Sequence, residues 1–178
     1  ETYKITKFDT LKEVVTQMVK RFQIVWSEFD AEAKALGWSR HQVITFASIV
    51  EKETGHESDR TIVSSVFHNR LKKKMKLQTD PTVLYGVAIN KGAMPNNITK
   101  LDLVTPTRYN TYTIASLPPT PISNPGRNAI VAALRPANTK YLYFVSRNDG
   151  TTAFSESLNQ HNNAVNVFQV NPKAREGK

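Results

Sequence analysis

The chain has 178 residues, of which 39% are hydrophobic and 22% are charged, a composition typical of folded globular domains and not of disordered chains. No apolar run approaches about 18 residues, so we expect no membrane-spanning segment. The absence of cysteine excludes disulfides and cysteine metal sites. The formal charge of +9 favours contact with a polyanion, whether nucleic acid, anionic lipid or an acidic polymer. We expect a single domain over residues 1–178.

The first forty residues are predicted to form an extended entry and one long helix. Apolar residues keep helical spacing without a break from Leu11 to Leu36. Thr10 or Asp9 can cap the start of this helix, and Gly37 can end it. We expect its aromatic side chains to lie in the core.

A second helix is predicted to begin after Ser39 and to end at Gly55. Glu51 lies in its last turn, where the helix dipole and apolar neighbours favour the protonated carboxyl. A carboxyl that keeps its proton near neutral pH suits general acid catalysis, so Glu51 is the candidate catalytic residue. Glu53 points to nearly the opposite side of the helix and is interpreted as a surface or structural residue.

The next helix is predicted to start at Ser58 or Asp59 and to run to Leu71, with a basic run at its end formed by Arg70, Lys72, Lys73 and Lys74. These cations complement the helix dipole in a solvated helix end. Alternatively, they form a rim that attracts an anionic substrate.

The stretch from Leu77 to Thr82 contains the second unusual polar group. Asp80 before Pro81 is predicted to cap a short helix that runs through Tyr85. Gln78 has no comparable structural need, and a polar loop residue between rigid flanks is a good candidate for a ligand contact.

The middle of the chain is predicted to be rich in loops. Thr99 can cap a brief helix that ends before Pro106. The prolines between Leu117 and Gly126 favour a rigid extended path, which either borders a cleft or connects two packed layers.

The remaining elements are predicted to be two helices and a hairpin. One helix begins at Pro125 and runs through Leu134, and the last runs from about Leu158 to Val170, where Asn171 and Pro172 end it. Between them, residues 141–145 favour a strand that turns at residues 148–150 and returns through residues 151–154.

Several kinds of catalytic site are absent from the sequence. The four histidines show no zinc-ligand spacing, and no glycine-rich phosphate loop or Gly-x-Ser-x-Gly elbow is present. We therefore expect no metal and no cofactor.

Taken together, six ordered stretches resemble the YceG-like (MltG) endolytic murein transglycosylases. The resemblance covers residues 3–170 and is carried by Ala47-Ser48-Ile49-Val50-Glu51-Lys52-Glu53-Thr54, Val66-Phe67-x-Asn69-Arg70-Leu71, Leu77-Gln78-Thr79-Asp80-Pro81-Thr82-Val83, Tyr109-Asn110-Thr111-Tyr112, Leu117-Pro118-Pro119-x-Pro121-Ile122-x-Asn124-Pro125-Gly126 and Tyr141-Leu142-Tyr143-Phe144-Val145. The sequence departs from the family pattern at Ser116, where glycine is expected, and at Thr152, where many members have histidine.

The resemblance implies an α+β fold, a mainly helical lysozyme-like core with a small antiparallel hairpin. It implies that the family's catalytic glutamate is Glu51, and that Gln78, Tyr85, Asn110 and Tyr112 line the cleft. The implied reaction cleaves the bond between MurNAc and GlcNAc, with the sugar's own 6-hydroxyl as nucleophile, and leaves 1,6-anhydro ends. Thr79 and Asp80 would hold the turn that presents Gln78, and His161 would be a structural helix residue.

The implied partners are peptidoglycan glycan strands and cell-wall synthesis enzymes, not nucleic acid. The implied location is periplasmic or extracytoplasmic, on an inner-membrane protein whose membrane anchor and LysM-like subdomain lie outside this chain. Two other functions stay open: a muramidase in which Asp80 assists a water molecule, and a non-catalytic basic module that binds anionic glycan or nucleic acid.

Overall fold

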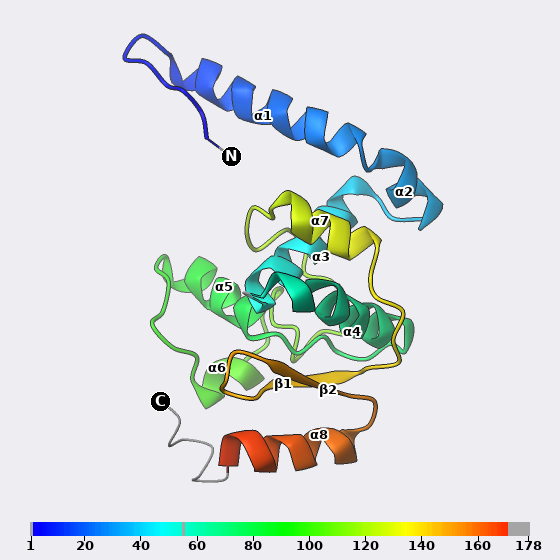
Figure 1. Ribbon diagram of the computed structural model, residues 1–178. Helices are drawn as coiled ribbons and strands as arrows, with labels where there is room; N and C mark the ends of the chain where they lie inside the picture. The colour runs from blue at the N-terminus through cyan, green and yellow to red at the C-terminus, as the bar shows by residue number, and fades with distance from the viewer. Residues whose placement is uncertain (1, 55, 171–178) are drawn as a thin grey trace. The chain divides into compact units, whose positions relative to one another are not determined.

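A computed structural model describes residues 2–54 and 56–170 (Figure 1). The predicted stop at Gly55, the end at Asn171 and Pro172, and the terminal tail lie outside these residues. The chain divides into two compact units, residues up to Arg40 and residues from His41 onward, and each is described by itself. Whether residues 1–178 act as one domain stays a prediction.

The first unit contains α1 (Leu11–Ser27) and α2 (Asp30–Ala35). Thr10 caps α1, as one of the two predicted candidates, and forms a capping box: its side chain accepts a hydrogen bond from the Glu13 amide, and the Glu13 side chain accepts one from the Thr10 amide. The prediction of one unbroken helix to Leu36 is wrong. The α-helical hydrogen bonding is interrupted where the amides of Glu28 and Phe29 donate to carbonyls three residues back, and the Phe29 ring is buried there.

In the first unit, two aromatic side chains are buried, whereas most of the aliphatic side chains along α1 are exposed. Trp26 and Phe29 are buried, as predicted for the aromatic side chains, and the Trp26 indole donates a hydrogen bond to Asp30 over 3.0 Å. The aliphatic side chains of α1 are largely exposed, among them Leu11, Val15, Met18, Val19 and Ile24. Among the described residues, no helix combines the length and apolar character needed to cross a membrane.

The second unit is built on α3 (Arg40–Glu53). Seven of its residues are buried, namely Val43, Thr45, Phe46, Ala47, Ser48, Ile49 and Val50. The proline-rich segment packs along this helix, because the Ser48 hydroxyl accepts a hydrogen bond from the Ile122 amide over 3.0 Å. The segment is therefore held against the helix that carries both candidate glutamates.

A 3₁₀ turn (Glu57–Asp59) leads into α4 (Arg60–Lys72), against which α7 (Arg127–Leu134) packs (Figure 1). The Ser64 hydroxyl donates to the carbonyl of Ala132 over 2.6 Å, and a His68 ring nitrogen lies 2.8 Å from the carbonyl of Ala133. Small and polar side chains on α4 thus satisfy the carbonyls at the end of α7.

The remaining helices of the middle segment are α5 (Asp80–Lys91) and α6 (Lys100–Val104). The helix predicted to run through Tyr85 is longer than expected and ends at Gly92, whose φ is 73°. Thr99 caps α6 as predicted, and it forms a capping box with Asp102.

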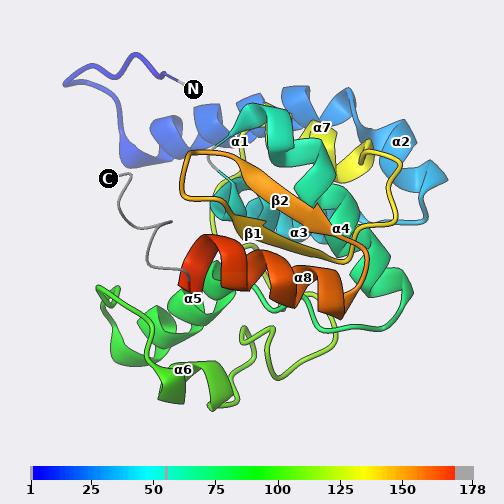
Figure 2. The same ribbon diagram turned by 60° about the horizontal axis from the view of Figure 1, so that its bottom comes forward.

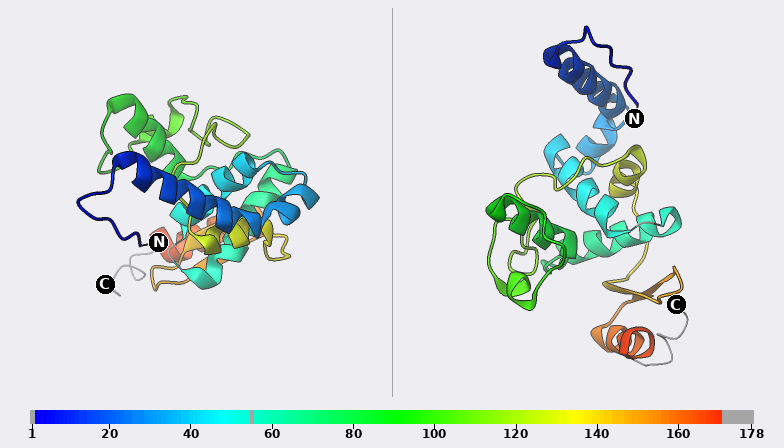
Figure 3. Two further views of the ribbon diagram at one scale, coloured as in Figure 1. Left: turned by 90° about the horizontal axis from the view of Figure 1, so that it is seen from above. Right: turned by 90° about the vertical axis from the view of Figure 1, so that its left-hand side faces the viewer.

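The chain then forms an antiparallel hairpin of β1 (Tyr143–Ser146) and β2 (Thr152–Ser155), with Phe144 opposite Phe154. The hairpin contacts α4 and is followed by α8 (Leu158–Val165), which lies along both strands (Figures 2 and 3). A π-helical turn (Asn166–Val170) completes the last predicted helix. The predicted α+β class, mainly helical with a small hairpin, is confirmed.

Candidate functional site

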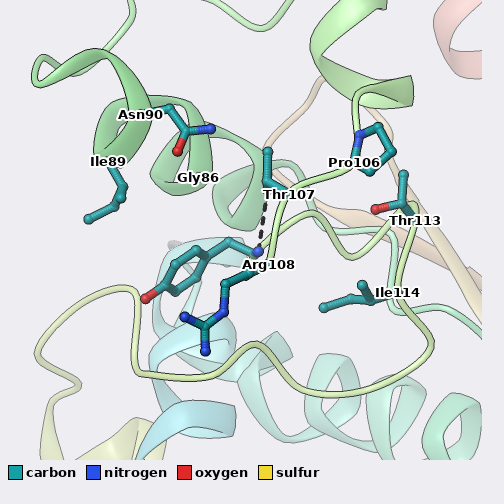
Figure 4. Close-up of a pocket in the computed structure, with 9 residues that line it drawn as sticks. Gly86, Ile89, Asn90, Pro106, Thr107, Arg108, Thr113 and Ile114 are labelled. Atoms are coloured by element: carbon teal, nitrogen blue, oxygen red, sulfur yellow. Dashed lines mark hydrogen bonds between the residues drawn. The ribbon is translucent and has the colours of Figure 1, made fainter.

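Two hollows lie in the second unit, and they differ in chemistry. The larger, about 790 Å³, lies between α5 and the loop at residues 106–114 (Figure 4). Its lining contains one charged residue, Arg108, and no carboxylate. The smaller, about 350 Å³, is lined by Glu53, Arg70, Leu77, Gln78, Asp80, Tyr112, Tyr143, Phe144, Leu158 and His161. We take this second cavity, hereafter the acidic cavity, as the candidate site because it gathers titratable groups from four helices, a strand and a loop.

Glu53 is the last residue of α3 and contributes a carboxyl to the acidic cavity. Its Oε2 atom is buried and has no hydrogen-bond partner among the described residues. Burial raises the pKa of Glu53 to about 7; the negative charge of Asp80 adds to this rise and the positive charge of Arg70 opposes it. The interpretation of Glu53 as a surface residue is therefore wrong, and the alternative of a structural role stays untested.

Glu51 lies in a different environment. Its Oε2 accepts a hydrogen bond from the amide of Gly126 over 3.2 Å, at the start of α7, and it does not line the acidic cavity. Residues two positions apart on a helix point about 200° apart around its axis, so only one of the two glutamates can reach this cavity. The predicted separation of the two side chains is confirmed, and the raised pKa belongs to Glu53.

Gln78 lines the acidic cavity, as the resemblance implied. Its φ of 52° lies in the left-handed region, which is unfavourable for most residues other than glycine and asparagine. Its amide donates to the carbonyl of Thr111 over 3.1 Å, which fixes the turn.

Arg70 supports this turn from behind. Its Nη1 donates to the carbonyl of Leu77 over 2.7 Å, and its Nε donates to the carbonyl of Leu142 over 2.7 Å. The residue is only 7% exposed, so for Arg70 both readings of the basic run, a solvated helix end and a rim of charge, are wrong. The guanidinium instead joins the turn before α5 to the segment that enters β1.

Tyr112 and Asp80 form another wall of the acidic cavity. The Tyr112 hydroxyl donates to Oδ1 of Asp80 over 2.6 Å, and burial together with this bond raises the pKa of Tyr112. The prediction that Asp80 caps α5 is wrong, because Thr79 occupies the N-cap position and Asp80 is the first helical residue. Asp80 thereby becomes available to the cavity.

Asn110 and Tyr85, which the resemblance placed in the cleft, do not line the acidic cavity. Asn110 is fully buried, and its Nδ2 donates to the carbonyls of Asp102, Leu103 and Thr105 at the end of α6. The Tyr85 ring packs edge-to-face on Tyr109, with 4.9 Å between ring centroids. Both residues serve packing in this structure, and their predicted contact with substrate is not supported.

His161 enters the acidic cavity from α8. Its ring stacks on Tyr143 with 5.3 Å between centroids, and its Nδ1 is buried without a hydrogen-bond partner in the described part of the chain. Burial and the positive charge of Arg70 lower the pKa of His161, which favours the neutral ring. The residue lines the acidic cavity, and its predicted role as a structural helix residue stays untested.

The comparison with known proteins gives the family. The profile of the YceG-like family matches residues 1–167. This chain belongs to the YceG-like family. Across 94% of its length it is 40% identical to a Bacillus subtilis (strain 168) protein named endolytic murein transglycosylase. The same name is carried by a protein of Streptococcus pneumoniae serotype 2, to which 97% of the chain is 28% identical.

A crystal structure of a YceG-like protein from Listeria monocytogenes has the same fold, with a TM-score of 0.81 and 40% identity over 92% of this chain. The chain covers 46% of the Bacillus protein, 31% of the Streptococcus protein and 52% of the Listeria chain. It thus spans about half the length of the YceG-like relatives it matches, or less.

No group of three or more potential metal ligands occurs in the described part of this YceG-like chain. The acidic cavity itself offers carboxyl, hydroxyl, amide, guanidinium and imidazole groups. Sequence reasoning did not place Glu53 or His161 in this set, and it considered Asp80 only for the muramidase alternative. For Glu53 a signal existed, because it shares the matched stretch with Glu51. The assignment of the catalytic role to Glu51 stays a prediction.

Proposed function

We propose that this domain is a peptidoglycan lytic transglycosylase in which Glu53 acts as general acid and then general base. The observation that carries the proposal is a single buried carboxyl, Glu53, with an unpartnered Oε2 and a pKa raised to about 7, in a cavity lined by polar side chains. The names of the Bacillus and Streptococcus relatives support the substrate class.

The proposed first step uses the proton of Glu53. The carboxyl donates it to the oxygen of the bond between MurNAc and GlcNAc while the bond from C1 to that oxygen breaks and C1 gains oxocarbenium character. The GlcNAc residue leaves with a new hydroxyl, and Glu53 is left as a carboxylate.

In the second step this carboxylate takes the proton of the MurNAc 6-hydroxyl as its oxygen bonds to C1. The product is a 1,6-anhydro ring, and Glu53 is again protonated. No water is consumed, and one carboxyl suffices for both proton transfers. Gln78 and Tyr112, which line the same cavity, are proposed to contact the sugar.

A second function, hydrolysis by a muramidase mechanism, has one observation in its favour. Asp80 lies in the same cavity as Glu53 and could activate a water molecule. Its Oδ1 atom already accepts a hydrogen bond from the Tyr112 hydroxyl over 2.6 Å, which occupies one of the two oxygens that could accept a proton from water and so favours the lytic reaction.

The test is digestion of purified murein followed by mass spectrometry of the fragments. We expect 1,6-anhydro ends from the wild-type domain, at least a thousandfold less from Glu53→Gln, and near wild-type amounts from the matched variant Glu51→Gln. Reducing ends in place of anhydro ends would support the muramidase. Loss of activity in Glu51→Gln with full activity in Glu53→Gln would return the role to Glu51.

We also propose that the domain works outside the cytoplasm, because murein, the substrate in the relatives' names, is assembled there. A fusion of the full-length protein to alkaline phosphatase, which is active only after export, tests this location. A fusion that stays inactive would contradict it.

A further inference from the structure

On the side of the acidic cavity formed by α8, a hydrogen-bond donor, His161, lies next to the apolar side chain of Leu158. Leu158 and His161 are three residues apart, one helical turn, and both line the cavity. Leu158 is 53% exposed although it is a large aliphatic side chain. Phe144 on β1 lines the cavity as well and extends the apolar surface.

The buried nitrogen of His161 indicates which ring nitrogen carries the proton. Nδ1 is enclosed and unpartnered, whereas Nε2 is not enclosed and forms no hydrogen bond with a described residue. A buried N–H without an acceptor is rarer than a buried lone pair without a donor. The neutral ring therefore carries its proton on Nε2, and stacking on Tyr143 fixes the plane of the ring.

Two other donors that line the cavity already bond to protein groups. The Arg70 guanidinium donates to the carbonyls of Leu77 and Leu142 through Nη1 and Nε, and the Tyr112 hydroxyl donates to Asp80. A ligand acceptor that lies over Leu158, one turn from His161, would meet the Nε2–H of His161. A neutral acceptor is favoured, because the imidazole is uncharged and the carboxyls of Glu53 and Asp80 share the cavity.

We propose that His161 and Leu158 form a subsite for the 2-acetamido group of an N-acetylhexosamine. The acetamido carbonyl accepts a hydrogen bond from His161 Nε2–H, and the acetamido methyl group packs on Leu158 and Phe144. A plain sugar hydroxyl would use the donor but leave the apolar surface exposed. This inference rests on the proposed glycan substrate and makes His161 a residue that determines specificity.

The test compares two neutral β-1,4-linked tetrasaccharides that differ at C2, chitotetraose with acetamido groups and cellotetraose with hydroxyls. Calorimetry measures the binding of each sugar to the Glu53→Gln protein. This variant lacks the proposed catalytic acid and is therefore not expected to cleave the sugars. We expect chitotetraose to bind on the order of tenfold more tightly, as one hydrogen bond and one buried methyl group would give.

The variants are made in the same Glu53→Gln background. His161→Ala should remove most of the preference for chitotetraose and leave cellotetraose binding within about twofold. His161→Gln, which keeps an N–H donor, should retain part of the preference, and Leu158→Ala should reduce it a few-fold. His56→Ala, an exposed histidine outside the cavity, is the matched control and should change neither affinity.

Equal affinity of the parent protein for both sugars, or an equal loss for both in His161→Ala, would overturn the inference. So would failure of chitotetraose to bind at all. The lytic function is tested separately by anhydro ends from murein. Cleavage without discrimination would refute only the subsite, whereas absence of cleavage with intact discrimination would refute only the lytic reaction.

Discussion

The Tyr112 hydroxyl lies 2.6 Å from the Asp80 carboxylate and donates a hydrogen bond to it at the edge of the cavity that holds Glu53. The bond ties the loop at residue 112 to the first turn of α5. It also places a negative charge close enough to raise the pKa of Glu53. Asp80 thus influences the proposed acid without making a hydrogen bond to it.

Replacing Asp80 with Asn should move the pH dependence of catalysis. Since the Asp80 charge contributes to the raised pKa of Glu53, its removal lowers that pKa, and Glu53 loses its proton at lower pH. We expect the alkaline limb of kcat/KM, near pH 7 in the wild type, to shift to lower pH, with activity best preserved near pH 5. A murein turbidity assay across pH measures this shift. Tyr112→Phe, which keeps the Asp80 charge, is the control, and an unmoved limb in Asp80→Asn would contradict the coupling.

The stability of the domain should depend on pH through Glu53. The pKa of Glu53 is about 7 in the folded state and about 4.5 when unperturbed, so between these values the folded state binds more protons. Stability therefore falls as pH rises from about 4.5 to 7. Glu53→Gln should lack this slope and be more stable than the wild type at pH 8 by at most about 3 kcal/mol.

Urea unfolding at pH 4.5 and pH 8 measures this difference. The matched variant Glu51→Gln retains Glu53 and should keep the slope. A parallel pH dependence in the wild type and in Glu53→Gln would show that the carboxyl is not held in its protonated form.

Arg70→Lys should destabilise the domain by about 3 kcal/mol. Lysine lacks the planar guanidinium that donates to the carbonyls of Leu77 and Leu142 at the same time. These buried carbonyls would therefore lose hydrogen-bond partners. Lys72→Ala, at an exposed site on the same helix, should stay within about 0.5 kcal/mol of the wild type. Equal stability of the two variants in urea would argue against a structural role for Arg70.

Asn110→Ala should lower stability by about 2–4 kcal/mol and leave the activity of the folded fraction intact. The side chain donates to three carbonyls at the end of α6, and it is fully buried, so a ligand in solution does not reach it. Thermal unfolding and kcat below the transition separate the two effects. A stable but inactive variant would instead support the contact with substrate expected from the sequence.

Gln78→Gly should lower activity and leave stability intact, which is the opposite of the result expected for Asn110→Ala. Glycine adopts the φ of 52° without strain, so stability should be unchanged or higher by up to about 1 kcal/mol. Activity on murein should fall at least tenfold because the amide is lost from the cavity. Full activity of this variant would remove Gln78 from the proposed substrate contacts.

Much of the fold follows from local signals in the sequence. The caps at Thr10 and Thr99, the hairpin and the order of the helices are all present as predicted. The break before α2 was missed because Phe29 keeps the apolar spacing of a helix while the amides of Glu28 and Phe29 donate to carbonyls three residues back instead of four. Apolar spacing records which side chains are buried and not whether the backbone stays helical between them.

The candidate site could be predicted only in part, and α3 shows why. Residues 45–50 are all buried, so this helix has no solvent face from which the direction of the cleft could be read. Periodicity could therefore separate Glu51 from Glu53 but could not choose between them. The choice depends on long-range contacts, with Gly126 approaching one carboxyl and the turn at Gln78 lying near the other.

The burial of α3 would also make the proposed lytic activity conditional on complete folding. The helix that ends in Glu53 is the centre of the second unit, and burial of that carboxyl among its neighbours raises its pKa. A partly folded chain would expose Glu53, which would then ionise at neutral pH and could no longer donate a proton. A lytic transglycosylase of the proposed kind would thus stay inactive until its core has formed, without a separate inhibitor.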